Sequence, residues 1–236
     1  MIDLQKGYRI IDLSEKLIPD LLEINGDYTW GTNVRKFELN QFMAKHDQMI
    51  MHFVNTETHV GTHVEVPLHL KKDGKSSADM PLQTFFGEAV VLNFDHLTPQ
   101  DGKGQPVLPA HLEDKIKPQD ILLVWSSYKG EERPYIAPET ARWLVQRPIK
   151  MLGVTVGMSV YLEHPRSEDP GFEDAWVTHK SLLEAEIPII ENMDHLEDVK
   201  KERVYLFAFP LRVTSLESSW IRAVAFEPID SGGNPS

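Results

Sequence analysis

Three histidines and one glutamate fall within eleven residues of this chain, in the run H-V-G-T-H-V-E-V-P-L-H that covers residues 59–69. Imidazole and carboxylate groups are usual protein ligands of zinc, manganese and iron. A single histidine or glutamate is more often a surface residue, so the prediction rests on the density of the cluster. We interpret His59, His63, Glu65 and His69 as parts of one metal-dependent site.

The spacing of the cluster restricts the backbone that can carry it. In an extended strand the Cα atoms of His63 and Glu65 lie about 7 Å apart on one face, which suits a shared ion. His59 and His63 would lie about 13 Å apart, which is too far for one ion. Gly61, Pro67 and the β-branched residues between them disfavour a helix. We therefore predict a turn or bulge at residues 61–62 that folds His59 back toward His63.

A second pair of candidate ligands lies far along the chain, at His179 and Glu191. The intervening residues predict a short helix with Thr178 as N-cap, followed by a strand at Ile187–Ile190. Eight helical residues advance about 12 Å, and four or five strand residues return about 15 Å. His179 and Glu191 are then at the same end, and Glu191 follows an apolar run where a buried carboxylate needs a partner such as a metal.

The remaining pattern predicts one mixed α/β domain rich in strands, residues 1–230, with a flexible C-terminal tail at 231–236. Strands are expected at Tyr8–Leu13, Ala89–Phe94, Asp120–Trp125, Ile149–Val154, Val204–Phe209 and Arg222–Phe226, one or two more within Phe37–Phe53, and a helix at Pro138–Val145. Residues 19–35 predict a long surface loop. The remaining histidines and one acid are expected to have no role in the site. Those near the cluster are expected to be surface residues: His46, Asp47 and His52. The others have no partner at ligand spacing in the sequence: His96, His111, His164 and His195.

Composition excludes several kinds of partner and site. The formal charge is −12, which argues against nucleic acid and anionic membranes as partners. There is no cysteine, so any metal must be held by nitrogen and oxygen atoms. The N-terminus lacks the pattern of a secretory signal, and no apolar run reaches the roughly 20 residues that span a bilayer. We expect a cytoplasmic protein that acts on a small molecule.

The cluster resembles the His-x-Gly-Thr-His-x-Asp-x-Pro-x-His signature of the cyclase-like metal-dependent hydrolases, of the kynurenine formamidase and isatin hydrolase type. Further segments resemble the family in the same order along the chain: Ile11–Ser14, Trp143–Val154, His179–Leu183, Ile190–Asn192, Phe209–Leu211 and Ile221–Ala225. The resemblance implies a swivelling β/β/α fold, a homodimer or homotetramer, and one or two divalent ions, Zn²⁺ or Mn²⁺.

The resemblance also implies roles for single residues. His59, His63 and Glu65 would bind a first ion. A second ion would be bound by Glu65, His179 and Glu191. His69 would be the catalytic proton shuttle.

Two positions depart from the family pattern. Glu65 stands where the family has Asp, and its extra methylene displaces the carboxylate by roughly 1.5 Å. That change bears on whether the site holds one ion or two. Thr155 stands where the family commonly has an acid, so substrate handling is expected to differ.

The favoured function is hydrolysis of an amide-like C–N bond, in an aryl formamide or a cyclic amide. The ion would activate a water molecule and stabilise the oxyanion, and His69 would transfer the proton. Tyr28 and Trp30 in the 19–35 loop are candidate substrate-binding residues. Two alternatives stay open: a metal-dependent cyclase or dehydratase, and a non-catalytic metal-bearing protein that binds a ligand.

Overall fold

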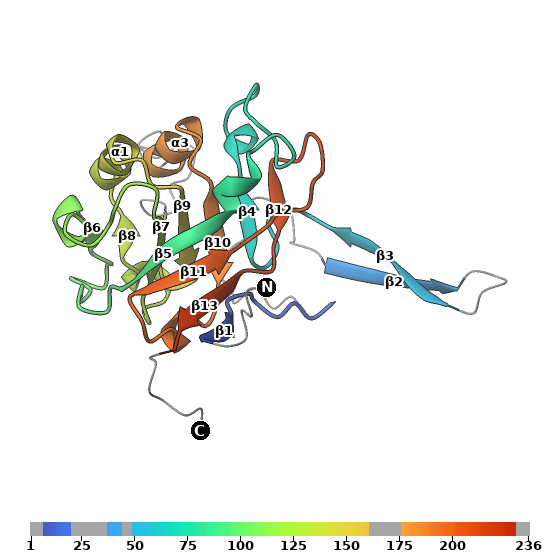
Figure 1. Cartoon of the computed structure of the whole chain (residues 1–236), viewed down its shortest axis with the longest axis horizontal. Coiled ribbons are helices and arrows are strands. Elements are labelled where there is room, and N and C mark those ends of the chain that lie inside the picture. Colours follow the sequence, from blue (N-terminus) through green and yellow to red (C-terminus); the bar gives the residue numbers. More distant parts are fainter. Residues whose placement is uncertain (1–6, 20–36, 44–48, 161–175, 230–236) are drawn as a thin grey trace.

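The fold is built on a single curled sheet, and the computed structural model describes residues 7–19, 37–43, 49–160 and 176–229 of it (Figure 1). In the order of the sheet, the strands are β1 (Tyr8–Asp12), β13 (Val224–Pro228), β11 (Arg203–Phe207), β5 (Phe86–Asn93), β7 (Ile121–Trp125), β9 (Met151–Thr155), β10 (Ile189–Met193), β4 (His63–Glu65) and β12 (Ser218–Trp220). The mixed α/β prediction is therefore confirmed.

The centre of the sheet is parallel and its two edges are antiparallel. Strands β5, β7, β9 and β10 run parallel to one another, while β4 pairs antiparallel with both β10 and β12. The parallel strands read as continuous apolar runs because both of their faces are covered. The predicted strands of this region are confirmed, with ends shifted by one to three residues.

The two faces of the sheet bury two separate cores. On β7, Ile121 and Leu123 point into the first core, and Leu122 and Val124 into the second. The second core also contains residues of α1 (Pro138–Gln146) and α3 (Val177–Glu184), so these two helices cover that face. The helix predicted at Pro138–Val145 is confirmed, with Pro138 in its first turn.

The start of α3 differs from the sequence prediction. Thr178 is not the N-cap: the helix begins at Val177, and Trp176 occupies the N-cap position without a side-chain hydrogen bond. The Thr178 hydroxyl instead donates to the Ile136 carbonyl at 2.9 Å, in the short strand β8 (Tyr135–Ile136) that pairs with β6 (Pro106–Val107). A long-range bond has replaced the local one, because Thr178 is buried where another strand offers an acceptor.

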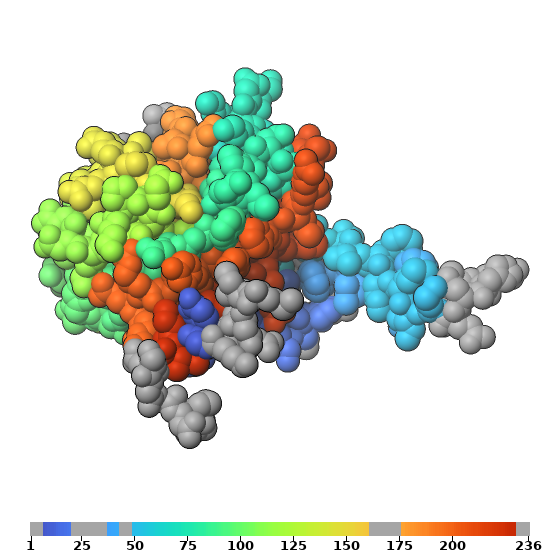
Figure 2. Space-filling model, viewed as in Figure 1, coloured from blue at the N-terminus to red at the C-terminus, as the bar shows by residue number. Residues whose placement is uncertain are grey.

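A two-stranded arm stands apart from the main sheet. Strands β2 (Phe37–Met43) and β3 (Ile50–Thr56) form an antiparallel hairpin that projects away from the body (Figures 1 and 2). The prediction of one or two strands here is confirmed as two, with β3 continuing three residues further. The arm ends at Thr56, three residues before His59.

Candidate metal centre

Strand β4 places two of the predicted ligands on one face. Val64 lies in the first core, so by strand alternation His63 and Glu65 point to the opposite, helix-covered face. His63 is paired directly with Glu191 across β10, and Glu65 with Ser218 across β12. Both side chains are at most 1% exposed. Hydrogen-bonded strands on both sides therefore fix the backbone that carries them.

The predicted bend before β4 is present. Gly61 has a φ of +65°, in the left-handed region that glycine adopts without strain. A Cβ atom at this position would lie 2.7 Å from the Leu17 side chain. The bend brings the rings of His59 and His63 together, with centroids 5.0 Å apart. Residues that an extended strand would separate therefore meet in one site.

Thr62 ties this bend to the neighbouring strand. Its hydroxyl donates to the Asn192 carbonyl of β10 at 2.6 Å and accepts from the Glu15 backbone N–H at 2.7 Å. Asn192 has a φ of +54°, at a register irregularity in the pairing of β9 with β10. The bend and the bulged strand are thus fastened to each other beside the histidines.

Helix α3 supplies His179 from the other side. His179 lies in the first turn of α3 and is fully buried, and its Nε2 atom lies 4.0 Å from Glu191 Oε1. The same Nε2 atom makes a close contact with Glu65 Oε2. The prediction that an antiparallel helix and strand bring His179 and Glu191 together is confirmed.

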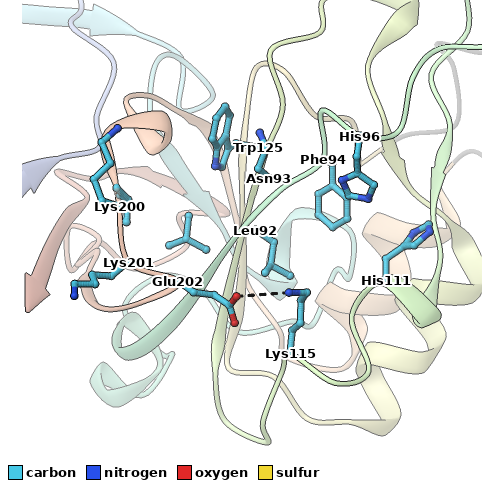
Figure 3. A pocket seen from close by; sticks show the side chains of 12 residues that line it. Leu92, Asn93, Phe94, His96, His111, Lys115, Trp125, Lys200, Lys201 and Glu202 are labelled. Atoms are coloured by element: carbon cyan, nitrogen blue, oxygen red, sulfur yellow. Dashed lines mark ion pairs between the residues drawn. The ribbon is translucent and has the colours of Figure 1, made fainter.

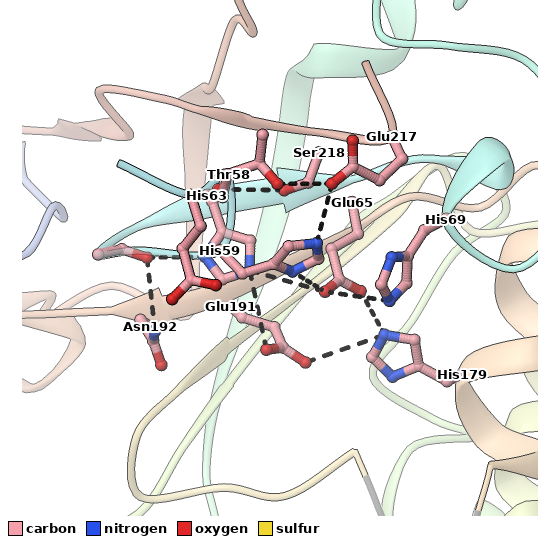
Figure 4. Close-up of polar contacts among 12 residues, drawn as sticks. Thr58, His59, His63, Glu65, His69, His179, Glu191, Asn192, Glu217 and Ser218 are labelled. Carbon is pink, nitrogen blue, oxygen red and sulfur yellow. Dashed lines mark hydrogen bonds and ion pairs between the residues drawn. The ribbon is translucent and has the colours of Figure 1, made fainter. Parts of the chain in front are cut away.

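The two oxygens of Glu65 face different histidines, as Figure 4 shows. Oε1 lies 2.8 Å from His59 Nδ1, 3.6 Å from His63 Nε2 and 3.8 Å from His69 Nε2, whereas Oε2 contacts His179. The carboxylate therefore lies centrally among the histidines. Glu65 belongs to two sets of potential ligands whose ligand atoms all lie within 4.8 Å of one another. The first set is His59, Glu65 and His69, and the second is His63, Glu65 and Glu191.

Pro67 and the 3₁₀ turn Pro67–His69 set the position of His69. The His69 backbone N–H donates to the Val66 carbonyl at 2.9 Å. The His69 ring lies 4.6 Å from that of His59 and 5.8 Å from that of His179, measured between centroids. The side chain is 23% exposed, so it borders both the buried ligands and the solvent.

The carboxylates and histidines shift one another's proton affinities. Burial raises the pKa of Glu65, but His179 and the other histidines outweigh it, and the pKa lies well below its ordinary value. Burial and the charge of Glu65 raise the pKa of Glu191. Burial lowers the pKa values of His63 and His179, yet their carboxylate neighbours raise both overall.

His69 has the opposite shift from the other two histidines. Burial lowers the pKa of His69, and the neighbouring rings of His59 and His179 lower it further against the pull of Glu65. The imidazole is therefore neutral around pH 7. A neutral imidazole can accept a proton, whereas an imidazolium cannot.

Sequence reasoning missed one carboxylate of the site. Glu217, directly before β12, lies 3.4 Å from His59 Nε2 and accepts a hydrogen bond from the Thr58 hydroxyl at 2.5 Å. Burial raises the pKa of Glu217, but the bond from Thr58 and the neighbouring histidines lower it overall. No local motif marks this residue, because only the pairing of β12 with β4 brings it to the site.

Other titratable groups lie elsewhere or outside the description. His52 is exposed on the arm, as predicted. The prediction for His195 was wrong, because it forms an exposed group with Asp194 and Glu197 whose ligand atoms lie within 4.8 Å. The candidate substrate residues Tyr28 and Trp30, together with His46, Asp47 and His164, lie outside the described residues.

A hollow of about 410 Å³ lies near the ends of β5 and β7 (Figure 3). His96 and His111 line it with their rings 6.1 Å apart, and Lys115 pairs with Glu202 at 3.5 Å. Neither histidine belongs to a set of three potential metal ligands among the described residues. This hollow shares no residue with the cluster around Glu65.

Thr155, at the end of β9, stands where the sequence resemblance expects an acid. Its hydroxyl accepts the Gly157 backbone N–H at 3.3 Å, within its own turn.

Among the described residues, no helix has the length and apolar character needed to cross a membrane.

Comparison with known proteins now decides the family. The family model Cyclase matches residues 11–157, well over half of the chain. The chain belongs to the cyclase family. The kynurenine formamidase of Erythrobacter litoralis is 29% identical over 230 residues, covering 95% of this chain and 96% of that protein. The kynurenine formamidase of Bacillus cereus is 28% identical over 222 residues, covering 91% and 95%.

Solved structures share the fold of this cyclase-family chain. Isatin hydrolase A from Labrenzia aggregata superposes with a TM-score of 0.74 at 20% identity, covering 94% of each chain. A protein from Bacillus stearothermophilus described as a predicted metal-dependent hydrolase superposes with a TM-score of 0.67 at 19% identity, covering 94% of this chain and 99% of that one. At these identities the likeness establishes the fold alone.

Proposed function

We propose that the protein is a metal-dependent amidohydrolase that cleaves an amide-like C–N bond, in an aryl formamide or a cyclic amide. The observation that carries the proposal is the convergence of four histidines and two carboxylates around Glu65, in a chain whose relatives include kynurenine formamidases. The names of the structural neighbours, isatin hydrolases among them, point to the same class of bond.

The donor atoms fit a divalent cation. His63 Nδ1 lies 2.7 Å from the Gly61 carbonyl, and because a carbonyl only accepts, the proton must sit on Nδ1. His63 Nε2 is then an acceptor, fully buried and without a hydrogen bond among the described residues. It points toward Glu65 and Glu191, at 3.6 and 3.9 Å. A cation between these groups satisfies an atom that otherwise carries a desolvation cost.

The ligands that we propose are His59, His63, Glu65, His179 and Glu191. The central position of Glu65, with one oxygen toward His59 and the other toward His179, would let it hold an ion together with the histidines on either side. Its longer side chain reaches both groups from β4. Zinc and manganese both accept such nitrogen and oxygen donors, and we propose one of these two as the ion.

A divalent ion in this site supplies a Lewis acid that polarises a carbonyl group and lowers the pKa of water. The chain itself supplies the proton carrier. His69 is neutral near pH 7, borders the ligand cluster and reaches solvent, so it can take a proton from water and return it to the leaving nitrogen. The adjacent rings of His59 and His179 restrict where His69 can move.

The test is turnover of a formyl-anilide by protein stripped with a chelator and then titrated with zinc or manganese. We expect no turnover without metal and restored turnover on titration, with the products gaining the mass of one water molecule. His63→Ala is expected to lose turnover. His96→Ala, which removes an exposed histidine that belongs to no set of potential ligands among the described residues, is its matched control. Equal turnover by stripped and restored protein would overturn the proposal, and loss of a water mass would support a dehydratase instead.

We also propose a homo-oligomer, a dimer or tetramer, in the cytoplasm. The arm supports the first part, since its residues Ile50, Phe53 and Val54 are 65%, 66% and 52% exposed. An isolated two-stranded hairpin is marginally stable in water, and exposed apolar patches mark contact surfaces. Native mass measurement at micromolar concentration tests this: a monomer would contradict it.

A further inference from the structure

His59 lies between two carboxylates, and its two ring nitrogens face different ones (Figure 4). Nδ1 lies 2.8 Å from Glu65 Oε1, and Nε2 lies 3.4 Å from Glu217 Oε1. A neutral imidazole binds a metal with one nitrogen and carries a proton on the other. The nitrogen that faces the ligand cluster is Nδ1, so the proton of a metal-binding His59 belongs on Nε2, opposite Glu217.

In His63 the two ring nitrogens have the opposite roles: Nδ1 carries the proton and Nε2 faces the ligand cluster. Its Nδ1 donates to the Gly61 carbonyl at 2.7 Å, which leaves Nε2 toward Glu65 and Glu191. Histidines that bind metals almost always give their second ring N–H to a carboxylate or a carbonyl, which fixes the tautomer and the ring orientation. His63 has its acceptor in the backbone next to it, and His59 needs one from elsewhere.

Glu217 is itself held in place. Its Oε1 atom accepts the Thr58 hydroxyl at 2.5 Å, from the residue directly before His59. Its carbonyl accepts the Val66 backbone N–H at 3.0 Å, at the point where β4 ends. Glu217 is therefore tied to the chain on both sides of the His59–Glu65 segment, its carboxylate through Thr58 and its backbone through Val66.

We propose that Glu217 is a positioning residue that accepts the Nε2 proton of His59 and so presents Nδ1 to the metal. The inference rests on the proposed metal site. Glu217 is not a ligand in this account: it acts through His59, and it belongs to neither of the ligand sets around Glu65.

A double-mutant cycle on metal affinity tests the coupling. Zinc or manganese affinity is measured by competition with a chromophoric chelator, on the whole protein, for wild type, Glu217→Ala, His59→Ala and the double variant. We expect Glu217→Ala to weaken binding about 10- to 100-fold. In the His59→Ala background, Glu217→Ala is expected to change metal affinity little further, because Glu217 acts on the metal through the His59 ring, which this background lacks.

Conservative variants separate positioning from folding. Glu217→Gln keeps the side-chain shape and one oxygen acceptor, so it is expected to retain more affinity than Glu217→Ala. Thr58→Val removes the donor that holds Glu217 and is expected to weaken binding less than Glu217→Ala. Glu184→Gln, on the exposed side of α3 and 49% exposed, is the matched control that leaves affinity unchanged.

Two results would overturn the inference. If Glu217→Ala weakens binding equally with and without His59, Glu217 is a direct ligand or a general structural element. If neither Glu217→Ala nor Glu217→Gln changes affinity, it has no part in the site. Failure of the proposed metal site would give a different result. Wild type would then bind no metal, or His63→Ala would bind it as tightly as wild type.

Discussion

The candidate metal centre has two halves that differ in how the fold holds them. The inner half is His63, Glu65 and His179, which are at most 1% exposed and lie on β4 and α3. The outer half is His59, His69 and Glu217, whose side chains are 19%, 23% and 33% exposed. His59 lies at a bend, His69 in a 3₁₀ turn, and Glu217 directly before β12. The inner residues lie on a strand of the sheet and on the helix α3, whereas the outer residues lie in the irregular segments beside them.

The difference indicates a division of tasks. Strand pairing on both sides of β4 fixes the inner side chains before any ion arrives, which lowers the cost of ordering ligands on binding. The outer side chains are partly exposed to solvent. We therefore expect changes to the inner half to act on both metal binding and folding. In the outer half, we expect changes to His69 to act on turnover, and changes to His59 or Glu217 to act on metal affinity.

The largest effect is expected from Glu65→Gln in the inner half. Removing one partner of a buried charged pair typically costs about 3–5 kcal/mol, and here it leaves His59 and His179 without their shared carboxylate. We expect loss of bound metal together with reduced stability of the metal-free protein. Elemental analysis and urea unfolding measure the two effects. Retained metal at wild-type stability would remove the distinction between the halves.

His69→Asn in the outer half is expected to slow turnover by about 100- to 10,000-fold, the range for loss of a general acid or base. The metal content should stay at the wild-type level, because this account gives His69 the proton and not the ion. Steady-state kinetics and elemental analysis on the same sample provide the check. If metal is lost along with activity, His69 is a ligand, as its place in a set with His59 and Glu65 would then indicate.

Gly61→Ala tests the bend that joins the halves. The new Cβ meets Leu17 at 2.7 Å, and φ at +65° is strained for alanine. Such strain costs about 1–3 kcal/mol. We expect a lower unfolding midpoint and a displaced His59, with weaker metal binding. Gly102→Ala is the matched control, since its φ of +76° is similarly strained but a Cβ there meets nothing within 4 Å. Equal effects of the two changes on metal binding would contradict the role given to the bend.

The smallest effect is expected far from both halves, at Glu227. This carboxylate accepts backbone N–H groups of Lys200 and Lys201 and pairs with Arg9. Burial raises the pKa of Glu227, but these donors outweigh it and lower the pKa overall. A lowered carboxylate pKa stabilises the fold above the unfolded pKa, about 4.3 for glutamate, and that contribution is lost as the pH falls through the lower folded value.

Glu227→Gln should therefore cost about 1–2 kcal/mol near neutral pH, with a smaller difference from wild type in acid. Urea unfolding of the metal-free proteins at pH 7 and near pH 3 gives this comparison. Metal affinity should not change. A stability difference between Glu227→Gln and wild type that grows as the pH falls would show that the pKa of Glu227 is raised in the fold and not lowered.

The parts of the site with local signals could be predicted from the sequence. Gly61 before a β-branched run requires a bend that brings His59 to His63, and the helix-then-strand spacing returns Glu191 to His179. The outer half could be predicted only in part. His59 and His69 belong to the motif, but Glu217 reaches it through the pairing of β12 with β4, and no local pattern encodes that register.

The error at Thr178 has a related cause. Threonine before a helix favours a local cap, yet the buried hydroxyl bonds to Ile136 in another strand. His195 shows the converse limit, since its acidic neighbours in sequence did group around it, on an exposed surface. Local spacing predicts which groups can meet, and the tertiary pairing decides which of them are buried together.

Turnover per bound metal, measured on the same samples of wild type, His63→Ala and His69→Asn, tests the division of the site most directly. The account predicts that His63→Ala loses metal and turnover in proportion, so that turnover per bound ion changes little. It predicts that His69→Asn keeps its metal and loses turnover per ion by at least about 100-fold. The same turnover per ion in all three proteins, or metal loss in His69→Asn, would contradict it.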